Sequence, residues 1–401
     1  MRRAIVNRRR FVTMGAGAVG ALTAGPNLSG ARELGAGRRP YGDRSSFETT
    51  AQSFNPSATP GTGSSRTPLQ DLHGIITPSS LHFERHHSGV PAIDPKKHQL
   101  LIDGLVKERL VFSIEDLLRL PSVSRIHFIE CAGNSGREHE GSPAPDAQKS
   151  HGLLSCSEWT GVPLKVLLDE AGIASSARWV VAEGADACRL NRSLPLEKAF
   201  DDALVVYGQN GEALRPEQGY PLRLLVPGWE GNVNVKWLSR LRVVTQPDMS
   251  REESAAYTDF MPDGSARRFS FVMEAKSVIT RPSGGQSLHG PGFYDITGLA
   301  WSGRGRFTRV AVSTNAGATW TNAQLNEPVL SKALTRFTFP WSWDGKNAVL
   351  QSRCVDETGY DQPTREQLIA VRGLHPGPDG FNHYNGIKQW FVSEGGQVSH
   401  V

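Results

Sequence analysis

The chain has 401 residues, of which 38% are hydrophobic, so it can bury a sizeable core and form roughly two or three domains. Its formal net charge of +4 is raised by an arginine cluster within the first ten residues, and it predicts no nucleic-acid-binding surface on the folded part. The four cysteines form no C-x-x-C or C-x-x-C-H pattern, which argues against a structural zinc site and against covalently attached haem.

Residues 1–30 have the pattern of an export signal. The pair Arg8 and Arg9 precedes an apolar, glycine- and alanine-rich run that is too short to span a bilayer. This pattern is typical of a twin-arginine signal, which carries folded proteins to the periplasm, and the alternative is a basic disordered tail. No other stretch predicts a membrane span. Residues 31–70 are rich in Gly, Ser, Thr, Pro and Arg and are expected to be a flexible leader without a fold.

Between residues 71 and 250, strand-like runs alternate with helix-like ones, which predicts a mixed α+β domain. One helix is expected at Ser113–Arg119, where Ser113 and Asp116 provide a start signal. A second is expected at Pro163–Ala171, which begins with a proline and ends before Gly172. The expected strands are His98–Ile102, Arg125–Glu130, Trp179–Ala182, Leu204–Tyr207, Arg223–Val226 and Arg240–Val244.

Residues 251–268 are polar and are expected to connect this domain to a second one at 269–401. The second domain shows short alternating strands separated by Gly, Pro and Asn, with no convincing helix, and Asn315-Ala316-Gly317 predicts a hairpin turn. The spacing is typical of an immunoglobulin-like β-sandwich. Its expected strands are Phe269–Glu274, Ser287–Trp301, Phe307–Ser313, Ala333–Phe339 and Ala348–Asp356.

Cys131 is the first candidate functional residue. It follows a short apolar strand-like run and opens the string C-A-G-N-S-G, which breaks that strand. A thiol at such a junction is held by rigid backbone and faces a loop whose amides can approach a charged ligand, which favours a metal-binding or nucleophilic role. The alternatives are a buried structural thiol and a disulfide of Cys131 with Cys156 or Cys188.

Two other places carry groups suited to an anion. In Leu81–His87, an arginine and two histidines cluster beside a large apolar residue, although such a set could also be a surface cluster or an opportunistic metal site. Tyr257 stands in the polar connector, where its phenol could hydrogen-bond a substrate oxyanion or pack across a domain interface.

Basic residues also flank a glycine loop. Arg223 lies on the strand-like run before Gly228, and Lys236 stands where the next apolar strand begins. The loop amides and the two positive side chains suit a phosphate-bearing cofactor. The alternative is that each cation is a snorkelling side chain at a strand end.

Together, the strings C-A-G-N, G-Y-P-L-R-L-L-V-P-G and V-K-W-L resemble the sulfite oxidase family of molybdopterin enzymes, over essentially the whole chain after the leader. The resemblance implies a molybdopterin-binding α+β domain followed by an immunoglobulin-like dimerisation domain. Strings such as Y-T-D-F-M-P-D-G and G-L-A-W-S-G-R-G resemble one subgroup most, the molybdenum subunits (sulfane dehydrogenases) of bacterial sulfur-oxidising Sox systems.

By motif, the resemblance implies that Cys131 is the thiolate that binds molybdenum beside the two sulfurs of one pterin, so that each molybdenum carries one molybdopterin. It further implies that Arg85 faces the substrate oxyanion and that Tyr257 neighbours the substrate. Contacts to the pterin and its phosphate are implied for three residues: His87, Arg223 and Lys236.

The chain also departs from the family pattern. Where animal sulfite oxidases read C-A-G-N-R-R, Ser135 and Gly136 replace the two arginines. Val233 replaces a basic residue and Ala256 replaces an acid. We expect the pocket to be roomier for these reasons and to admit a substrate larger than sulfite.

The implied activity is oxidation of sulfane sulfur, held as a persulfide on a sulfur-carrier protein, or of sulfite, by oxygen-atom transfer. Because the chain has no haem motif, the electrons would leave through a c-type cytochrome subunit with one or two haems. The implied assembly is a periplasmic homodimer through the C-terminal domain, or a heterotetramer with two cytochromes. Three alternatives stay open: a plain sulfite:cytochrome c oxidoreductase, a methionine-sulfoxide reductase, and a non-catalytic periplasmic scaffold.

Overall fold

The computed structural model describes residues 37, 40–57, 59–374 and 382–401. The described residues from Thr50 onward form one compact unit. The predicted twin-arginine signal at residues 1–30 lies outside the described residues. In the described part of the chain, no helix is long and apolar enough to cross a membrane.

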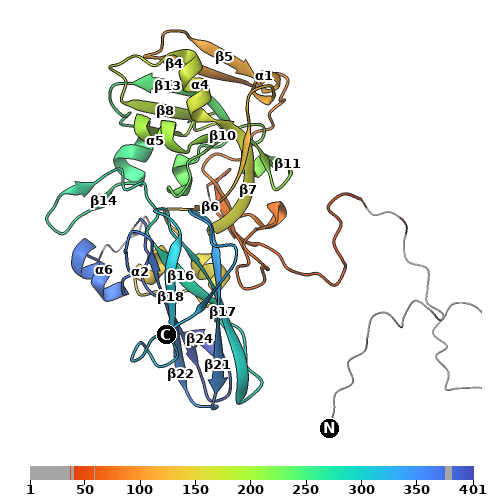
Figure 1. Ribbon diagram of the computed structural model, residues 1–401, viewed down its shortest axis with the longest axis vertical. Coiled ribbons are helices and arrows are strands. Elements are labelled where there is room, and N and C mark those ends of the chain that lie inside the picture. Colours follow the sequence, from red (N-terminus) through yellow and green to blue (C-terminus); the bar gives the residue numbers. More distant parts are fainter. Residues whose placement is uncertain (1–36, 38–39, 58, 375–381) are drawn as a thin grey trace, which may run out of the picture. The chain divides into compact units, whose positions relative to one another are not determined.

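Two sheets build the first domain (Figure 1). The first runs in the order β11 (Glu212–Ala213), β10 (Leu204–Gln209), β7 (Leu154–Pro163) and β6 (Val123–Glu130), with β12 (Arg223–Leu225) also paired to β10. The second runs in the order β5 (Leu110–Ser113), β4 (Gln99–Gly104), β13 (Leu238–Val244), β8 (Trp179–Gly184) and β9 (Asn191–Pro195). Only the β13–β4 pair among these is parallel.

The core of this domain draws apolar side chains from both sheets and from two helices, α4 (Leu164–Ala171) and α5 (Leu196–Asp201). Burying each such Leu or Val stabilises the fold by about 1.5 to 3 kcal/mol. The core fixes the strands that carry the site. Its fully buried members include Leu100, Leu167, Val180, Leu224 and Leu241.

The two predicted helices of this domain are confirmed, and their termini follow from local chemistry. At α1 (Ile114–Leu118), Ser113 caps the first turn in a reciprocal capping box with Asp116. Helix α4 begins after Pro163 and ends at Gly172. The φ of Gly172 is 67°, a left-handed conformation that glycine adopts at little cost in free energy.

Part of the leader forms strands, contrary to the expectation that it lacks a fold. β1 (Ser53–Pro56) and β2 (Gly63–Arg66) form a three-stranded sheet with β3 (Glu84–His86). All three strands are short and mostly polar, so no hydrophobic alternation marks them in the sequence. In register, Ser64 lies opposite Arg85.

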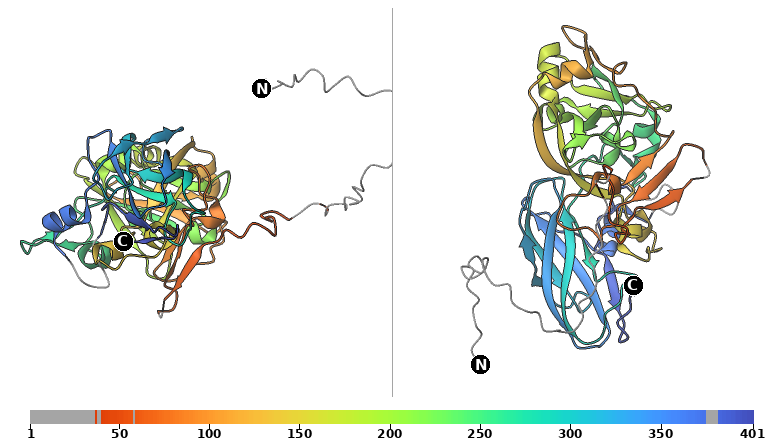
Figure 2. Two further views of the ribbon diagram at one scale, coloured as in Figure 1. Left: turned by 90° about the horizontal axis from the view of Figure 1, so that it is seen from below. Right: turned by 90° about the vertical axis from the view of Figure 1, so that its right-hand side faces the viewer.

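The second domain is a two-sheet sandwich, as predicted (Figure 2). Ile296, Val310, Phe337 and Leu350 pack between the sheets. One sheet has the order β16 (Lys276–Arg281), β17 (Gly292–Trp301), β21 (Thr335–Trp343) and β20 (Gln324–Asn326). The other has the order β19 (Thr321–Asn322), β18 (Phe307–Ser313), β22 (Ala348–Asp356), β23 (Gln389–Val392) and β24 (Val398–His400).

The predicted hairpin turn at Asn315-Ala316-Gly317 is confirmed, because β18 pairs antiparallel with β19 across it. Gly317 and Ala316 both adopt positive φ there. The prediction of no helix in this domain is wrong: α6 spans Arg365–Arg372 and starts at a Thr364–Gln367 capping box. Only Leu368 and Arg372 of this helix are buried, so it adds little apolar surface to the core. Its capping box was the clearest signal of it in the sequence.

The predicted strand Phe269–Glu274 is also wrong. Phe269 and Phe271 adopt positive φ, and the segment pairs only through one isolated bridge, Trp229 to Val272. The Phe271 ring stacks on the Trp229 ring instead, with 4.3 Å between the ring centroids. Aromatic stacking therefore replaces the ladder that the apolar run suggested.

The connector is partly ordered. A π-helix (Glu252–Ala256) leads into Tyr257, and a small hairpin of β14 (Asp259–Phe260) and β15 (Ala266–Arg267) follows. The remaining short helices are α2 (Gly136–His139), α3 (Ala147–His151) and the 3₁₀ turns Ser79–Leu81, Pro216–Gln218 and Gly231–Val233.

Candidate active site

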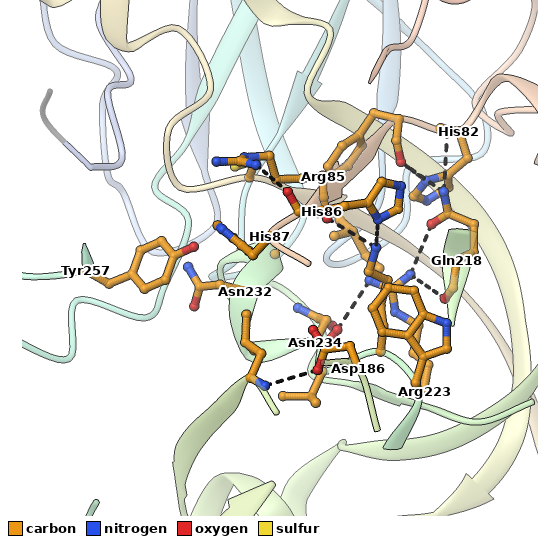
Figure 3. A pocket seen from close by; sticks show the side chains of 18 residues that line it. His82, Arg85, His86, His87, Asp186, Gln218, Arg223, Asn232, Asn234 and Tyr257 are labelled. Carbon is orange, nitrogen blue, oxygen red and sulfur yellow. Dashed lines mark hydrogen bonds between the residues drawn. The ribbon is translucent and has the colours of Figure 1, made fainter. Parts of the chain in front are cut away.

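A pocket opens where β6 ends, between strand β3, the β8–β9 loop and the segment 218–237 (Figure 3). It contains about 680 Å³ of empty space, its open mouth included. All six residues singled out from the sequence line it, although they come from separate stretches of the chain: Arg85, His87, Cys131, Arg223, Lys236 and Tyr257.

Backbone hydrogen bonds fix the position of Cys131. Its amide donates to the Leu153 carbonyl (3.0 Å), and its own carbonyl accepts from the Asn134 amide (2.9 Å). All four cysteines are free, so the disulfide alternatives for Cys131 are not realised. Burial raises the pKa of the Cys131 thiol, and the Gly133 amide and Arg85 partly oppose this.

The 228–234 loop closes tightly over Cys131. A Cβ at position 231 would lie 2.9 Å from the Glu130 carbonyl oxygen and 3.4 Å from the Cys131 Cα. Such a contact with backbone cannot be relieved by moving a side chain, so Gly231 allows the two loops to meet. The close approach needs a residue without a side chain.

Arg223 is buried without a countercharge. From β12, its Nη1 donates to the Gln218 carbonyl (3.1 Å) and Nη2 donates to the Asn234 carbonyl (3.3 Å), while its Nε has no partner. Burial lowers the pKa of the guanidinium to about 9. The guanidinium also lies over the Trp159 ring, 5.3 Å from its centroid.

Lys236 is the second cation of the inner pocket, and it is partly buried. Its Nζ lies 2.9 Å from His86 Nδ1 and donates to the carbonyls of Arg85 (3.1 Å) and Glu217 (3.0 Å). Burial, and then repulsion by Arg223, lowers the pKa of Lys236 to about 7. Sequence reasoning missed the role of His86, whose other ring nitrogen bonds Glu84 (2.8 Å) and so leaves Nδ1 to face the lysine.

The pocket therefore has an excess of positive charge. Within the described part of the chain, no carboxylate forms an ion pair with Arg85, Arg223 or Lys236. Arg85 is the exposed member and donates only to backbone carbonyls, of His86 (2.6 Å) and Gly63 (3.4 Å). Three cations without countercharge around one pocket indicate an anionic ligand.

The titratable rings in the pocket are neutral at pH 7. Burial lowers the pKa of His87 to about 4, with repulsion from Arg85 and Lys236 acting in the same direction. Burial raises the pKa of the Tyr257 phenol above its ordinary value, so this phenol keeps its proton and can donate it in a hydrogen bond.

Sequence reasoning missed the charged cluster behind Tyr257. Arg192 lies 4.8 Å from the centroid of the tyrosine ring, and its Nε donates to Glu253 (3.0 Å). Glu230 lies 3.7 Å from Arg192 and 3.4 Å from His383. A glutamate between Trp and Gly at position 230 was a signal, because a carboxylate in an apolar run needs a buried partner.

The four positions that depart from the family pattern do not line the pocket: Ser135, Gly136, Val233 and Ala256. Val233 is fully buried in the core of the first domain. Ser135 is buried in the loop after Cys131, with a left-handed φ of 66°. The expectation that these substitutions make the pocket roomier stays a prediction.

The donor set fits a metal that brings most of its ligands with it. No cluster of three or more His, Cys, Asp or Glu side chains in the described residues could hold a metal ion alone. Cys131 offers one soft thiolate, and the unpaired cations suit a phosphate attached to the same group. A molybdenum held by a pterin dithiolene meets both conditions.

The chain was compared with protein families and known structures. Residues 87–252 match the oxidoreductase molybdopterin binding domain, and residues 267–378 match the Mo-co oxidoreductase dimerisation domain. The crystal structure of the sulfane dehydrogenase SoxCD from Paracoccus pantotrophus superposes with a TM-score of 0.90 at 46% identity, covering 94% of this chain and 97% of that one. The chain belongs to the sulfite oxidase family.

Curated members of the sulfite oxidase family and related reductases are more distant. The mitochondrial sulfite oxidase of Mus musculus is 33% identical over 273 residues, 63% of this chain and 50% of that protein. The NADH nitrate reductase of Ulva prolifera is 28% identical over 302 residues, 67% of this chain and 34% of that protein. The chain thus spans half or less of the length of these relatives.

Family membership confirms the predicted fold, a molybdopterin-binding domain followed by a dimerisation domain. It also confirms the predicted cofactor, molybdenum with molybdopterin, since the matched domain is the one that binds it. The individual roles of the six pocket residues remain predictions.

Proposed function

We propose that this chain is the molybdenum subunit of a sulfane dehydrogenase. It would oxidise sulfane sulfur that is held as a persulfide on a sulfur-carrier protein. The observation that carries the proposal is 46% identity to sulfane dehydrogenase SoxCD over 97% of that chain. A match of this extent covers both domains, so it supports a function of the whole chain rather than of one module.

The inner part of the pocket would hold the cofactor. Cys131 would bind the metal as a thiolate, losing the proton that burial otherwise favours. Arg223 and Lys236 would neutralise the phosphate, and the neutral His87 ring would hydrogen-bond the pterin. Once bound, the molybdenum centre supplies oxygen-atom transfer and takes up the electrons.

The outer part of the pocket would hold the substrate. Arg85 is exposed at this wall and would bind the negatively charged sulfur–oxygen group. Tyr257, protonated at any physiological pH, would donate a hydrogen bond beside it. Both residues act by positioning and by charge stabilisation.

The chain would work with other proteins. Since it contains no haem motif, electrons would pass to a c-type cytochrome subunit with one or two haems. Two copies would associate through the dimerisation domain, giving a homodimer or, with two cytochromes, a heterotetramer. The twin-arginine pattern would place the assembly in the periplasm after export of the folded chain.

The test begins with the molybdenum content of the purified, exported protein and of a Cys131→Ser variant. We expect about one molybdenum per wild-type chain, and loss or altered ligation of the metal in the variant. Cytochrome reduction is then measured with a carrier-protein persulfide and with free sulfite. Faster reduction with the persulfide supports the proposal.

Other outcomes would contradict it. Faster turnover of free sulfite would favour a sulfite:cytochrome c oxidoreductase. Reduction of methionine sulfoxide without cytochrome reduction by sulfur donors would favour a reductase. A well-folded wild type that contains no molybdenum, prepared from a molybdenum-replete host, would leave a scaffold role.

A further inference from the structure

Glu130, the residue before Cys131, is the centre of a buried hydrogen-bond network. Its side chain is fully buried. Its Oε1 accepts from Lys276 Nζ (2.9 Å) and from Asn134 Nδ2 (2.8 Å), and its Oε2 accepts from Trp301 Nε1 (2.6 Å). Both carboxylate oxygens are therefore held, and the side chain has no freedom to reorient.

Two of these donors come from the second domain. Lys276 begins β16 and Trp301 ends β17, where they lie opposite each other in the antiparallel ladder. Lys276 also reaches the carbonyl of Asn134 (3.4 Å). One lysine from the sandwich domain thus holds both Glu130 and Asn134, which stand on either side of Cys131 in the chain.

Further hydrogen bonds hold residues 131–134, which we call the cysteine loop. Asn134 Nδ2 also donates to the His151 carbonyl (3.0 Å), and Asn134 Oδ1 accepts from the Leu153 amide (3.2 Å). The His383 amide, from the C-terminal segment, donates to the carbonyl of Ala132 (2.9 Å). The loop is therefore bound on several sides by groups that do not touch the pocket.

A buried ion pair of this kind is better explained by position than by stability. Removing two charges from water is costly, and an apolar pair of similar size is often at least as stable. Glu130 and Lys276 are both at most 1% exposed, and neither lines the pocket. What the pair provides is a fixed direction for the backbone that carries the thiol.

We propose that Lys276 is a positioning residue for Cys131, and that it acts through Glu130 to set how the thiolate meets the metal. This inference rests on the proposed role of Cys131 as the thiolate ligand. It assigns a task in the active site to the domain that family comparison describes only as a dimerisation domain. The site is incomplete without β16.

The test uses the full-length, metal-loaded protein and four variants. Lys276→Met removes the charge, Lys276→Arg retains it, and Trp301→Phe removes only the third donor to Glu130. Lys388→Met is the matched control, because Lys388 forms a similar buried pair with Glu138 (2.8 Å), and the only other hydrogen bond to that carboxylate within the described residues comes from the Ala144 amide rather than from residues 130–134. For each protein we would measure molybdenum content, the electron paramagnetic resonance signal of the reduced metal, and kcat and KM with the wild type's preferred sulfur substrate.

We expect Lys276→Met to shift the resonance signal and to lower kcat by about 10- to 100-fold with little change in KM, since residues that orient a metal ligand have effects of this size. Lys276→Arg should restore most of kcat. Trp301→Phe should shift the signal in the same direction by less. Lys388→Met should match the wild type in signal and kcat.

A folded, metal-loaded Lys276→Met protein with the wild-type signal and kcat would overturn the inference. If Lys276→Met does not fold, the Trp301→Phe and Lys276→Arg variants test the inference in its place. An unchanged resonance signal in Trp301→Phe would then overturn the inference. If Lys388→Met shifts the signal as much as Lys276→Met, the effect is general loosening and the inference fails. Absence of molybdenum from the wild type would instead reject the proposed function itself.

Discussion

The cations with little solvent exposure fall into two groups, which differ in what faces them. Arg223 and Lys236, at the pocket, face only carbonyl oxygens, a glutamine amide and a histidine ring. Behind the pocket, each buried cation meets a carboxylate. These pairs are Lys276 with Glu130, Arg192 with Glu253, Lys388 with Glu138, and Arg372 with Asp259.

The pKa values show the same division. Burial lowers the pKa of Arg223 to about 9. Burial and repulsion by Arg223 lower that of Lys236 to about 7, because the attraction of Glu84, Asp186 and Glu217 is too weak to offset them. Burial would raise the pKa of Glu230, but attraction by His383 and Arg192 lowers it to about 2. Charges that are paired within the protein hold the site in shape, whereas those left unpaired mark where a ligand must supply the countercharge.

The largest effect is expected from breaking a pair. Arg192→Met would leave Glu253 and Glu230 buried without their cation, and both are at most 1% exposed. We expect the free energy of unfolding to fall by about 3 to 5 kcal/mol, measured by urea denaturation.

The control for this prediction is Arg304→Met. Arg304 also makes a two-pronged contact with a carboxylate, Glu274, but its side chain is 40% exposed. Its loss should cost less than about 1 kcal/mol. Equal effects of the two substitutions would show that burial does not separate these pairs.

An intermediate effect is expected at the unpaired, exposed cation. Arg85→Met should raise KM by about 10- to 100-fold, the equivalent of losing one charge-assisted hydrogen bond of about 1.5 to 3 kcal/mol. Molybdenum content should stay at the wild-type level, because Arg85 lies on the substrate side in our assignment. Steady-state kinetics and metal analysis test this together, and an unchanged KM counts against the assignment.

The smallest effect is a pH dependence of the cofactor-free protein. The pKa of Lys236 is about 7 in the folded state and 10.5 ordinarily. Between these values the unfolded chain binds a proton that the folded chain does not. Stability should therefore rise as the pH increases from about 7 toward 10.5, and the penalty should be complete below pH 7. Because Lys236 is partly exposed, screening by solvent keeps this change small.

Denaturation curves of the wild type and Lys236→Met across this pH range provide the measurement. The variant should lack that part of the rise. So should the cofactor-loaded wild type, in which the phosphate would restore the charged lysine if Lys236 has the role that we propose. Curves that stay parallel in wild type and variant would mean that Lys236 is not penalised by burial.

The pocket residues could be predicted because short contiguous strings carry them. Glycine residues and charged side chains mark both the string around Cys131 and the string from Arg223 to Lys236. Glu130 and Lys276 stand 146 positions apart, and Arg192 and Glu253 stand 61 apart, so no local pattern links them. Only the fold reveals that each carboxylate already has a partner.

The difference between local patterns and contacts of distant residues also explains the errors in the fold prediction. Short apolar runs rich in β-branched residues located β18 and β22 correctly, because Val310, Val312 and Leu350 from these strands lie in the sandwich core. Phe269–Glu274 shows a similar apolar content, but its Phe271 ring stacks on Trp229 instead. Composition alone does not say whether aromatic residues will pack along a ladder or across a turn.

The small sheet of β1, β2 and β3 sets a practical limit on how the protein can be shortened. The strand that carries Arg85 has its only partner within the described residues in Gly63–Arg66, a segment that composition would assign to a dispensable leader. A recombinant protein that starts at residue 71 would keep every motif of the sulfite oxidase family. It would nevertheless lack the strand against which one wall of its pocket is built.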